Sequence, residues 1–240
     1  MICYLELGIY INMNKLESLK KLEEEIKANK SLPLRESNLV FGEGNHDCEV
    51  MFIGEAPGFH EDKLARPFVG RSGQLLDVLI KSIGWERKDV YITNIVKRRP
   101  PENRDPLPEE IELYKPYLAR QIEIINPKVI ATLGRFSMNY FLPSAKIMRD
   151  SGKLFKWEKP SFAKATEGQE GERGGNGAIR FIVPIIHPAA ALRSTSVLEA
   201  LEKSFKKLPS ILIKIEELKS QPAIQPKNSG DDQPEESQES

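Results

Sequence analysis

Short apolar runs that alternate with helical stretches are the feature that most constrains the fold of this chain. Three runs lead into polar or glycine-containing loops: EVMFIG (49–54), VYITNIV (90–96) and KVIATLG (128–134). A fourth run, IRFIVPIIH (179–187), ends in a histidine. Strands that alternate with helices predict an α/β fold, in which a mostly parallel sheet is covered by helices on both faces.

The helices are expected between and around these strands, where apolar residues recur at helical spacing. They are predicted over 15–30, 73–85, 108–125, 135–141 and 197–218. Proline interrupts two of these stretches, because its ring removes a donor and clashes with the preceding turn. We therefore expect a kink or a break at Pro116 and an interruption at Pro209.

The length of 240 residues suits one principal domain, which we place at residues 13–220. Three segments stand apart from it by composition: a doubtful N-terminal extension (1–12), a flexible insertion rich in Gly, Glu and Lys (159–178), and an acidic tail expected to be disordered (221–240). No run of 18 apolar residues occurs, so the sequence predicts no transmembrane helix and no membrane partner.

Charge and cysteine content exclude some classes of protein and leave others open. The formal net charge is zero, but without the tail the body carries 34 basic and 30 acidic residues. This mild excess permits nucleic-acid binding without arguing for it. Two cysteines, Cys3 and Cys48, are too few for a disulfide scaffold or a four-thiolate metal site, so we expect a cytoplasmic protein.

Functional residues are expected just after the strands, because ligands of open α/β sheets bind outside the carboxyl ends of the strands. The first strand is followed by GEAPGFHED (54–62) and RPFVGRSGQLL (66–76), which carry two carboxylates, Glu55 and Glu61, and the aromatic Phe68. A turn with solvated acids and a core phenylalanine explains these residues equally well.

The later strands add an amide, a basic stretch and a histidine. Asn94 lies inside an apolar strand, where its amide needs a buried partner or a ligand. The basic residues Lys97, Arg98, Arg99 and Arg104 form either a solvated loop or a phosphate contact. His187 ends the last strand, and a structural role is the ordinary alternative for both Asn94 and His187.

Four motifs in this order and spacing resemble the type 4 uracil-DNA glycosylases. They are GEAPGFHED, PFVGRSGQLLD, YITNIVK with the following RPP-NR-P, and HPAAALR. The resemblance runs from about residue 13 to about residue 210. It implies a three-layer α/β/α sandwich and an enzyme of base excision repair, which hydrolyses the N-glycosidic bond of deoxyuridine in DNA and leaves an abasic site.

The resemblance also implies a role for each residue. Glu55 and His187 would be catalytic: Glu55 holds the attacking water, and His187 faces uracil O2. The uracil itself would be bound by Gly54, Ala56, Glu61, Phe68 and Asn94, with Phe68 stacking on the base and Asn94 recognising O4 and N3–H. The loop through Leu192, Arg193 and Ser194 would contact the DNA. The expected partner is uracil-containing DNA, bound by a monomer.

One property of that family does not match the sequence. Type 4 enzymes typically carry a [4Fe–4S] cluster held by four cysteines, and the corresponding positions here are Lys27, Lys30, Arg98 and Tyr114. These side chains are not thiolates, so we predict that the protein has no cluster and no other metal or cofactor. The three cations would repel one another if they converged, so we expect the 98–114 loop to be rebuilt or spread apart.

Two alternatives to a glycosylase come from other functional classes. A DNA-binding protein of the same fold could have lost catalysis together with the cluster, but it would not need Glu55, Phe68, Asn94 and His187 together. A nucleotide-binding or polymerase-associated module is disfavoured because the chain has neither GxxxxGK[ST] nor GxGxxG.

Overall fold

A six-stranded sheet forms the centre of the computed structural model, which describes residues 4–157 and 180–220, with side chains for 14–157 and 180–218. The strands are β1 (Glu43–Gly44), β2 (Val50–Gly54), β3 (Tyr91–Asn94), β4 (Val129–Leu133), β5 (Phe155–Trp157) and β6 (Arg180–Ile185). Their order across the sheet is β1-β3-β2-β4-β6-β5. The four inner strands are parallel, and only the edge strands β1 and β5 are antiparallel to their neighbours. The predicted α/β fold with a mostly parallel sheet is confirmed.

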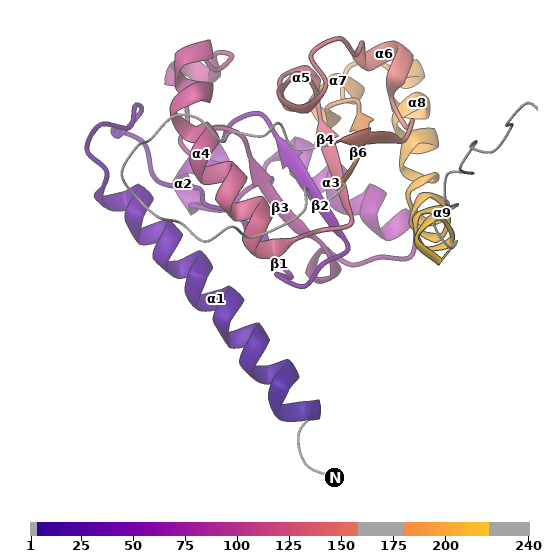
Figure 1. Ribbon diagram of the computed structural model, residues 1–240. Coiled ribbons are helices and arrows are strands. Elements are labelled where there is room, and N and C mark those ends of the chain that lie inside the picture. The colour runs from indigo at the N-terminus through magenta and orange to yellow at the C-terminus, as the bar shows by residue number, and fades with distance from the viewer. Residues whose placement is uncertain (1–3, 158–179, 221–240) are drawn as a thin grey trace, which may run out of the picture.

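Helices cover both faces of this sheet (Figure 1). They are α1 (Tyr4–Ala28), α2 (Phe59–Leu64), α3 (Arg71–Ser82), α4 (Pro108–Ile125), α5 (Arg135–Phe141), α6 (Ile147–Asp150), α7 (Pro188–Ala191), α8 (Thr195–Phe205) and α9 (Leu208–Ser220), with short 3-10 turns at Arg87–Asp89 and Pro101–Asn103. One layer is built from α1, α4 and α5, and the opposite layer from α3, α8 and α9.

The alternation of β2 side chains divides the core into two halves. Met51 and Ile53 pack into the cluster that includes α1 and α4, whereas Val50 and Phe52 pack into the cluster with α3, α8 and α9. Successive side chains of a strand point to opposite faces, so a strand buried on both sides is apolar throughout. This is why the first apolar run of the sequence marks the middle of the sheet.

Three helix expectations differ from the structure in their boundaries. Helix α1 begins at Tyr4 rather than near residue 15, because residues 4–12 contain no proline and extend the same helix. Helix α4 runs through Pro116 without a break, since its buried face, which includes Tyr114 and Leu118, holds it against the sheet. The last helical stretch divides at Lys206 and Lys207, and Pro209 lies in the first turn of α9, where proline is tolerated.

Two predicted segments lie outside the described residues, namely the 159–178 insertion and the 221–240 tail. In the part of the chain that the structure describes, no helix is long and apolar enough to cross a membrane.

Candidate active site

The register of the parallel strands brings the predicted functional loops together at one edge of the sheet. Gly54 at the end of β2 pairs with Asn94 at the end of β3. Beyond the strands, the Ile95 N–H donates to the Gly54 carbonyl at 3.0 Å and the Val96 N–H donates to the Glu55 carbonyl at 3.1 Å. The loops after β2 and β3 are therefore joined by backbone hydrogen bonds.

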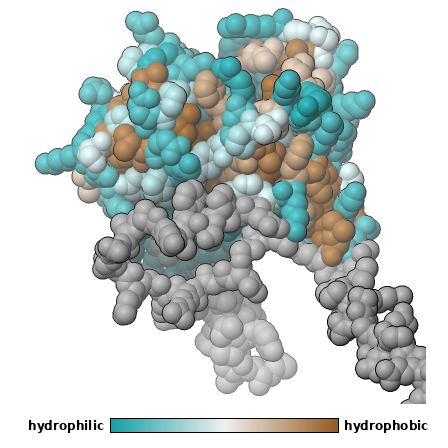
Figure 2. All heavy atoms as spheres, turned by 45° about the horizontal axis from the view of Figure 1, so that its top comes forward, coloured by the Kyte–Doolittle hydropathy of each residue, from teal (hydrophilic) through white to brown (hydrophobic). Residues whose placement is uncertain are grey.

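A cavity of about 290 Å³ opens between these loops. Five predicted site residues line it: Ala56, Glu61, Phe68, Asn94 and His187. Its other lining residues are Gly58, Ser72, Asn103 and Ala189. Figure 2 turns the upper side of Figure 1 toward the viewer, and this face shows hydrophilic side chains with apolar ones between them.

Asn94 offers the cavity a buried amide with an unused acceptor. The residue is 1% exposed, and its Oδ1 atom has no hydrogen-bond partner among the residues described. Gly54 makes this placement possible, because a Cβ atom there would lie 2.4 Å from Oδ1 of Asn94 and 2.6 Å from the Phe68 ring. A buried acceptor without a donor is costly, so this atom is prepared for a ligand N–H.

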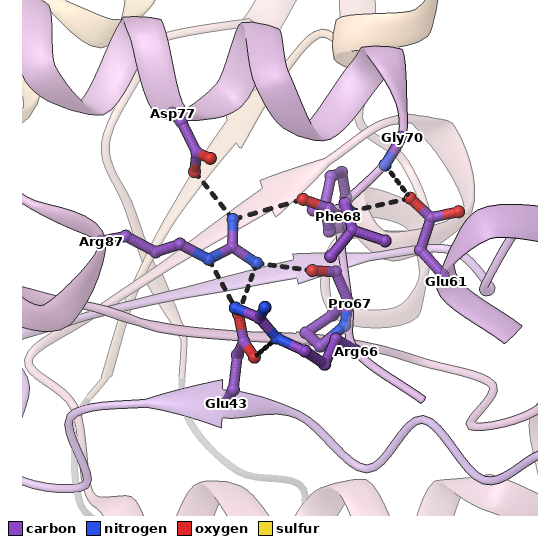
Figure 3. A network of polar contacts seen from close by, with 9 residues as sticks. Glu43, Glu61, Arg66, Pro67, Phe68, Gly70, Asp77 and Arg87 are labelled. Atoms are coloured by element: carbon purple, nitrogen blue, oxygen red, sulfur yellow. Dashed lines mark hydrogen bonds and ion pairs between the residues drawn. The ribbon is translucent and has the colours of Figure 1, made fainter. Parts of the chain in front are cut away.

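Phe68 forms an apolar wall of the cavity and is held in an unusual backbone conformation. The residue is buried, and its φ of 51° lies in the left-handed region that side chains with a Cβ atom rarely adopt. Arg87 fixes this conformation by donating to the carbonyl oxygens of Pro67 and Phe68, as Figure 3 shows. The guanidinium is in turn paired with Asp77 at 2.7 Å and with Glu43 at 2.8 Å.

Glu61 lines the cavity and also shapes the loop that carries Phe68 (Figure 3). Its Oε1 atom accepts hydrogen bonds from the N–H groups of Val69 at 2.9 Å and Gly70 at 2.8 Å. These contacts engage one carboxylate oxygen with the protein itself.

His187 presents a neutral imidazole to the cavity. Its Nδ1 atom accepts a hydrogen bond from the Ala189 N–H at 3.1 Å, which leaves the ring proton on Nε2. Burial lowers the pKa of His187 to about 4, and the nearby carboxylate of Glu61 opposes this shift only in part. The ring centre lies 5.8 Å from that of Phe68, so the N–H donor and the aromatic wall belong to the same cavity.

Glu55 lies beside the cavity, above a glycine that leaves room for it. A Cβ atom at Gly134 would lie 2.4 Å from Oε1 of Glu55 and 3.1 Å from Cβ of His187. The same carboxylate oxygen accepts the Phe136 N–H at 3.3 Å. Burial raises the pKa of Glu55, as expected for a carboxylate removed from water.

The predicted DNA-contacting residues do not line the cavity but lie on the surface beside it. Leu192, Arg193 and Ser194 follow α7, which begins directly after His187. Leu192 is 39% exposed, Arg193 is exposed and Ser194 is partly exposed. An exposed apolar side chain next to a cation suits contact with a duplex beside the cavity.

The prediction of a solvated or phosphate-binding basic stretch is wrong for two of its four residues. Lys97 is 0% exposed and Arg98 is 7% exposed, whereas Arg99 and Arg104 reach the surface. The two buried side chains find carbonyl acceptors in the interior, at Asn94 and at Ser37 respectively. The sequence signal was a run of like charges, which does not distinguish inward from outward side chains.

The four positions that correspond to cluster ligands do not fit an iron–sulfur cluster. The Tyr114 hydroxyl donates to the Pro33 carbonyl at 3.0 Å, and burial raises the pKa of Tyr114 to about 12, so the phenol stays protonated. Lys27 pairs with Glu23 at 2.9 Å and Glu24 at 2.8 Å, and Lys30 is exposed. Ammonium, guanidinium and phenol groups are not iron ligands of the kind that thiolates provide.

Lys27 and Arg98, two of the cations at these positions, lie around one hollow of the surface. Both line one cavity of about 510 Å³, and Arg98 contacts Tyr114. Each has its own partners: Lys27 pairs with two glutamates of its own helix, and Arg98 donates to the Ser37 carbonyl.

Two residues that line or support the site, Asn103 and Arg87, were not predicted from the sequence. Asn103 lines the cavity with a φ of 56° and accepts a hydrogen bond from Arg99 at 2.7 Å. Arg87 supports Phe68 from outside the cavity, and no sequence pattern pointed to it. Lys97 was noticed only as one member of the basic stretch.

Comparisons with known proteins show the family of this chain. The family profile described as the uracil DNA glycosylase superfamily matches residues 41–209. A type-4 uracil-DNA glycosylase of Sulfurisphaera tokodaii is 43% identical over 206 residues, covering 82% of this chain and 86% of the relative. Type-4 uracil-DNA glycosylases of Archaeoglobus fulgidus and Thermotoga maritima are 41% and 39% identical, covering 80% and 78% of this chain and 92% and 93% of the relatives.

Proposed function

Since this chain belongs to the uracil-DNA glycosylase superfamily and, within it, to the type-4 enzymes, we propose that it removes uracil from DNA by hydrolysing the N-glycosidic bond. The products are free uracil and an abasic site. The observation that carries the proposal is the buried Asn94 amide beside the aromatic wall of Phe68: no described residue donates a hydrogen bond to its Oδ1 atom. The alternative of a DNA-binding protein that has lost catalysis leaves this arrangement unexplained.

Recognition of the base follows from the hydrogen-bonding groups of uracil. Its N3–H can donate to Oδ1 of Asn94, and its O4 can accept from the Asn94 amide nitrogen. Cytosine presents an acceptor at N3 and a donor at C4, which face the amide with the wrong polarity. A base in a duplex must first be extruded, and stacking on Phe68 returns about 1–3 kcal/mol of that cost.

The bond cleavage places negative charge on uracil and positive charge on the sugar. As the glycosidic electron pair moves to the base, the Nε2–H of His187 stabilises the charge that grows on O2. Glu55 holds a water molecule below the sugar and takes its proton as the oxygen bonds to the anomeric carbon. Gly54 and Ala56 complete the loop around the base.

DNA is the partner that this chemistry requires. We propose that the enzyme acts as a monomer in the cytoplasm, and that Leu192, Arg193 and Ser194 contact the DNA next to the flipped nucleotide.

Asn94→Asp tests the proposed recognition. We expect the purified protein to release uracil from a uracil-containing oligonucleotide and the variant to do so about 10- to 100-fold more slowly, because a carboxylate cannot donate to O4 and a lost buried hydrogen bond costs about 1–3 kcal/mol. The measurement is alkaline cleavage of the abasic product, resolved on a gel. Release of cytosine by the parent protein at the same rate as uracil would contradict the recognition scheme, because cytosine presents an acceptor at N3 and a donor at C4.

We propose further that the enzyme carries no iron–sulfur cluster. Support comes from the chemistry of Lys27, Lys30, Arg98 and Tyr114 and from the presence of only two cysteines in the chain. We expect anaerobically purified protein to be colourless, without absorbance near about 400 nm, and to contain no stoichiometric iron, because a cubane needs about four ligands. About four irons per chain or per dimer would overturn this proposal.

A further inference from the structure

Lys97 is a buried cation that the proposed chemistry does not use. It follows Asn94 by three residues, and its side chain is 0% exposed within the core between the sheet and α4. Among the described residues no carboxylate contacts its ammonium group. Burial lowers the pKa of Lys97 well below its ordinary value, so a lysine at this position is an unfavourable choice for stability alone.

The Lys97 ammonium has three hydrogen-bond acceptors around it. They are the Thr93 hydroxyl oxygen at 2.6 Å, the Asn94 carbonyl oxygen at 2.8 Å and Oε1 of Gln121 at 2.6 Å. The Thr93 hydroxyl donates to the Phe41 carbonyl, and Nε2 of Gln121 donates to the same carbonyl. A carbonyl can only accept, so Nε2 of Gln121 must face Phe41 and Oε1 must face Lys97. Lys97 therefore has three acceptors for the three N–H groups of its ammonium.

One of these contacts holds the backbone of Asn94 itself. The Asn94 carbonyl belongs to the last residue of β3, and the Lys97 side chain folds back to hold it. The Lys97 carbonyl in turn accepts the Val40 N–H at 2.8 Å, which anchors the turn from its other side. Within the described part of the chain, Oδ1 of Asn94 accepts no hydrogen bond. The orientation of this side chain therefore depends on the position of its backbone.

We propose that Lys97 is a positioning residue, which holds the Asn94 peptide and thereby aims the Asn94 amide at the pyrimidine edge of the base. It does not touch the substrate. The inference rests on the proposed function, because it assigns Lys97 to the recognition step of that reaction. A displacement of about 1 Å between reacting groups can reduce a rate by about 100-fold. A change in the position of Asn94 should therefore have a measurable effect on the rate of uracil release.

The first test is a double-mutant cycle between Lys97 and Asn94, with single-turnover release of uracil as the readout. We expect Lys97→Met to lower the maximal single-turnover rate by about 10- to 100-fold, with little change in the enzyme concentration that gives half of that rate. In an Asn94→Ala background the same change should cost less than about threefold, because the group that Lys97 positions is already absent. An equal loss in both backgrounds would show a general structural effect and overturn the proposal.

Tyr114→Phe is the matched control. It removes the Tyr114 hydroxyl, which donates to the Pro33 carbonyl and contacts Arg98, from the same core. We expect its rate of uracil release to stay within about threefold of the parent, since each such hydrogen bond contributes only about 1 kcal/mol to stability and neither partner is Asn94. All variants are assayed at a temperature at which circular dichroism shows them folded.

The second test does not depend on activity. NMR relaxation of the Asn94 side-chain amide measures its order parameter, which we expect to fall in Lys97→Met and to remain unchanged in Tyr114→Phe. An unchanged order parameter in Lys97→Met would contradict the inference. If the parent protein released no uracil, the proposed function would fail, and the order parameter alone would decide whether Lys97 positions Asn94.

Discussion

Glu55→Gln is expected to slow uracil release by about 10²–10⁴-fold, the range for loss of a general base. Glutamine preserves the size of the side chain and its contact with the Phe136 N–H, but it cannot take a proton from water. Single-turnover assays on a uracil-containing oligonucleotide measure the effect. Glu49→Gln, which alters an exposed carboxylate outside the cavity, is the matched control and should retain the parental rate.

The same residue predicts the pH dependence of the reaction. Glu55 acts as a base only when ionised, and burial raises its pKa above the ordinary value near 4.5. Activity of the parent enzyme is therefore lost as the pH falls through this raised pKa and is retained above it. The residual activity of Glu55→Gln should not show this loss at low pH. If the variant lost activity over the same pH range as the parent, the titrating group would be another residue.

His187→Ala is expected to slow release by about 10²–10³-fold, the range for removal of one donor to a developing oxyanion. Because burial lowers the pKa of His187 to about 4, the imidazole is neutral at neutral pH and donates through Nε2 without gaining a charge. The parent enzyme should accordingly show no inflection near the ordinary histidine pKa of about 6.5.

The control for His187→Ala is His46→Ala, which changes a histidine in the turn between β1 and β2. Its rate should match that of the parent. A His187→Ala variant with parental kcat, or a pH profile with an inflection near neutrality that this substitution removes, would contradict the assigned role.

The sheet could be predicted from the sequence because its inner strands are buried on both faces. Continuous apolar runs such as VMFIG in β2 carry that signal, and the residues that follow them mark the ligand edge. The edge strand β1 could not be predicted in the same way. It has only two residues, Glu43 and Gly44, whose pairing with β3 depends on neighbouring structure rather than on an apolar pattern.

The candidate site was predictable where a residue lies next to a strand end. Asn94 and His187 were singled out for that reason, and the structure places both in the cavity. Arg87 was not, because its role arises from contacts between segments far apart in the chain, and Lys97 was placed in the basic stretch because a run of like charges does not show which side chain points inward. Lys97 reaches Gln121 of α4, and Arg87 reaches Glu43 and the Phe68 carbonyl.

The support of Phe68 by Arg87 has a consequence for how variants of this enzyme should be interpreted. The guanidinium that holds the loop is balanced by Glu43 and Asp77, neither of which lines the cavity. Natural or engineered changes at these two positions can therefore disturb base stacking while every residue that contacts the substrate stays intact. If variants were compared only at the residues that line the cavity, such proteins would be classed as active enzymes.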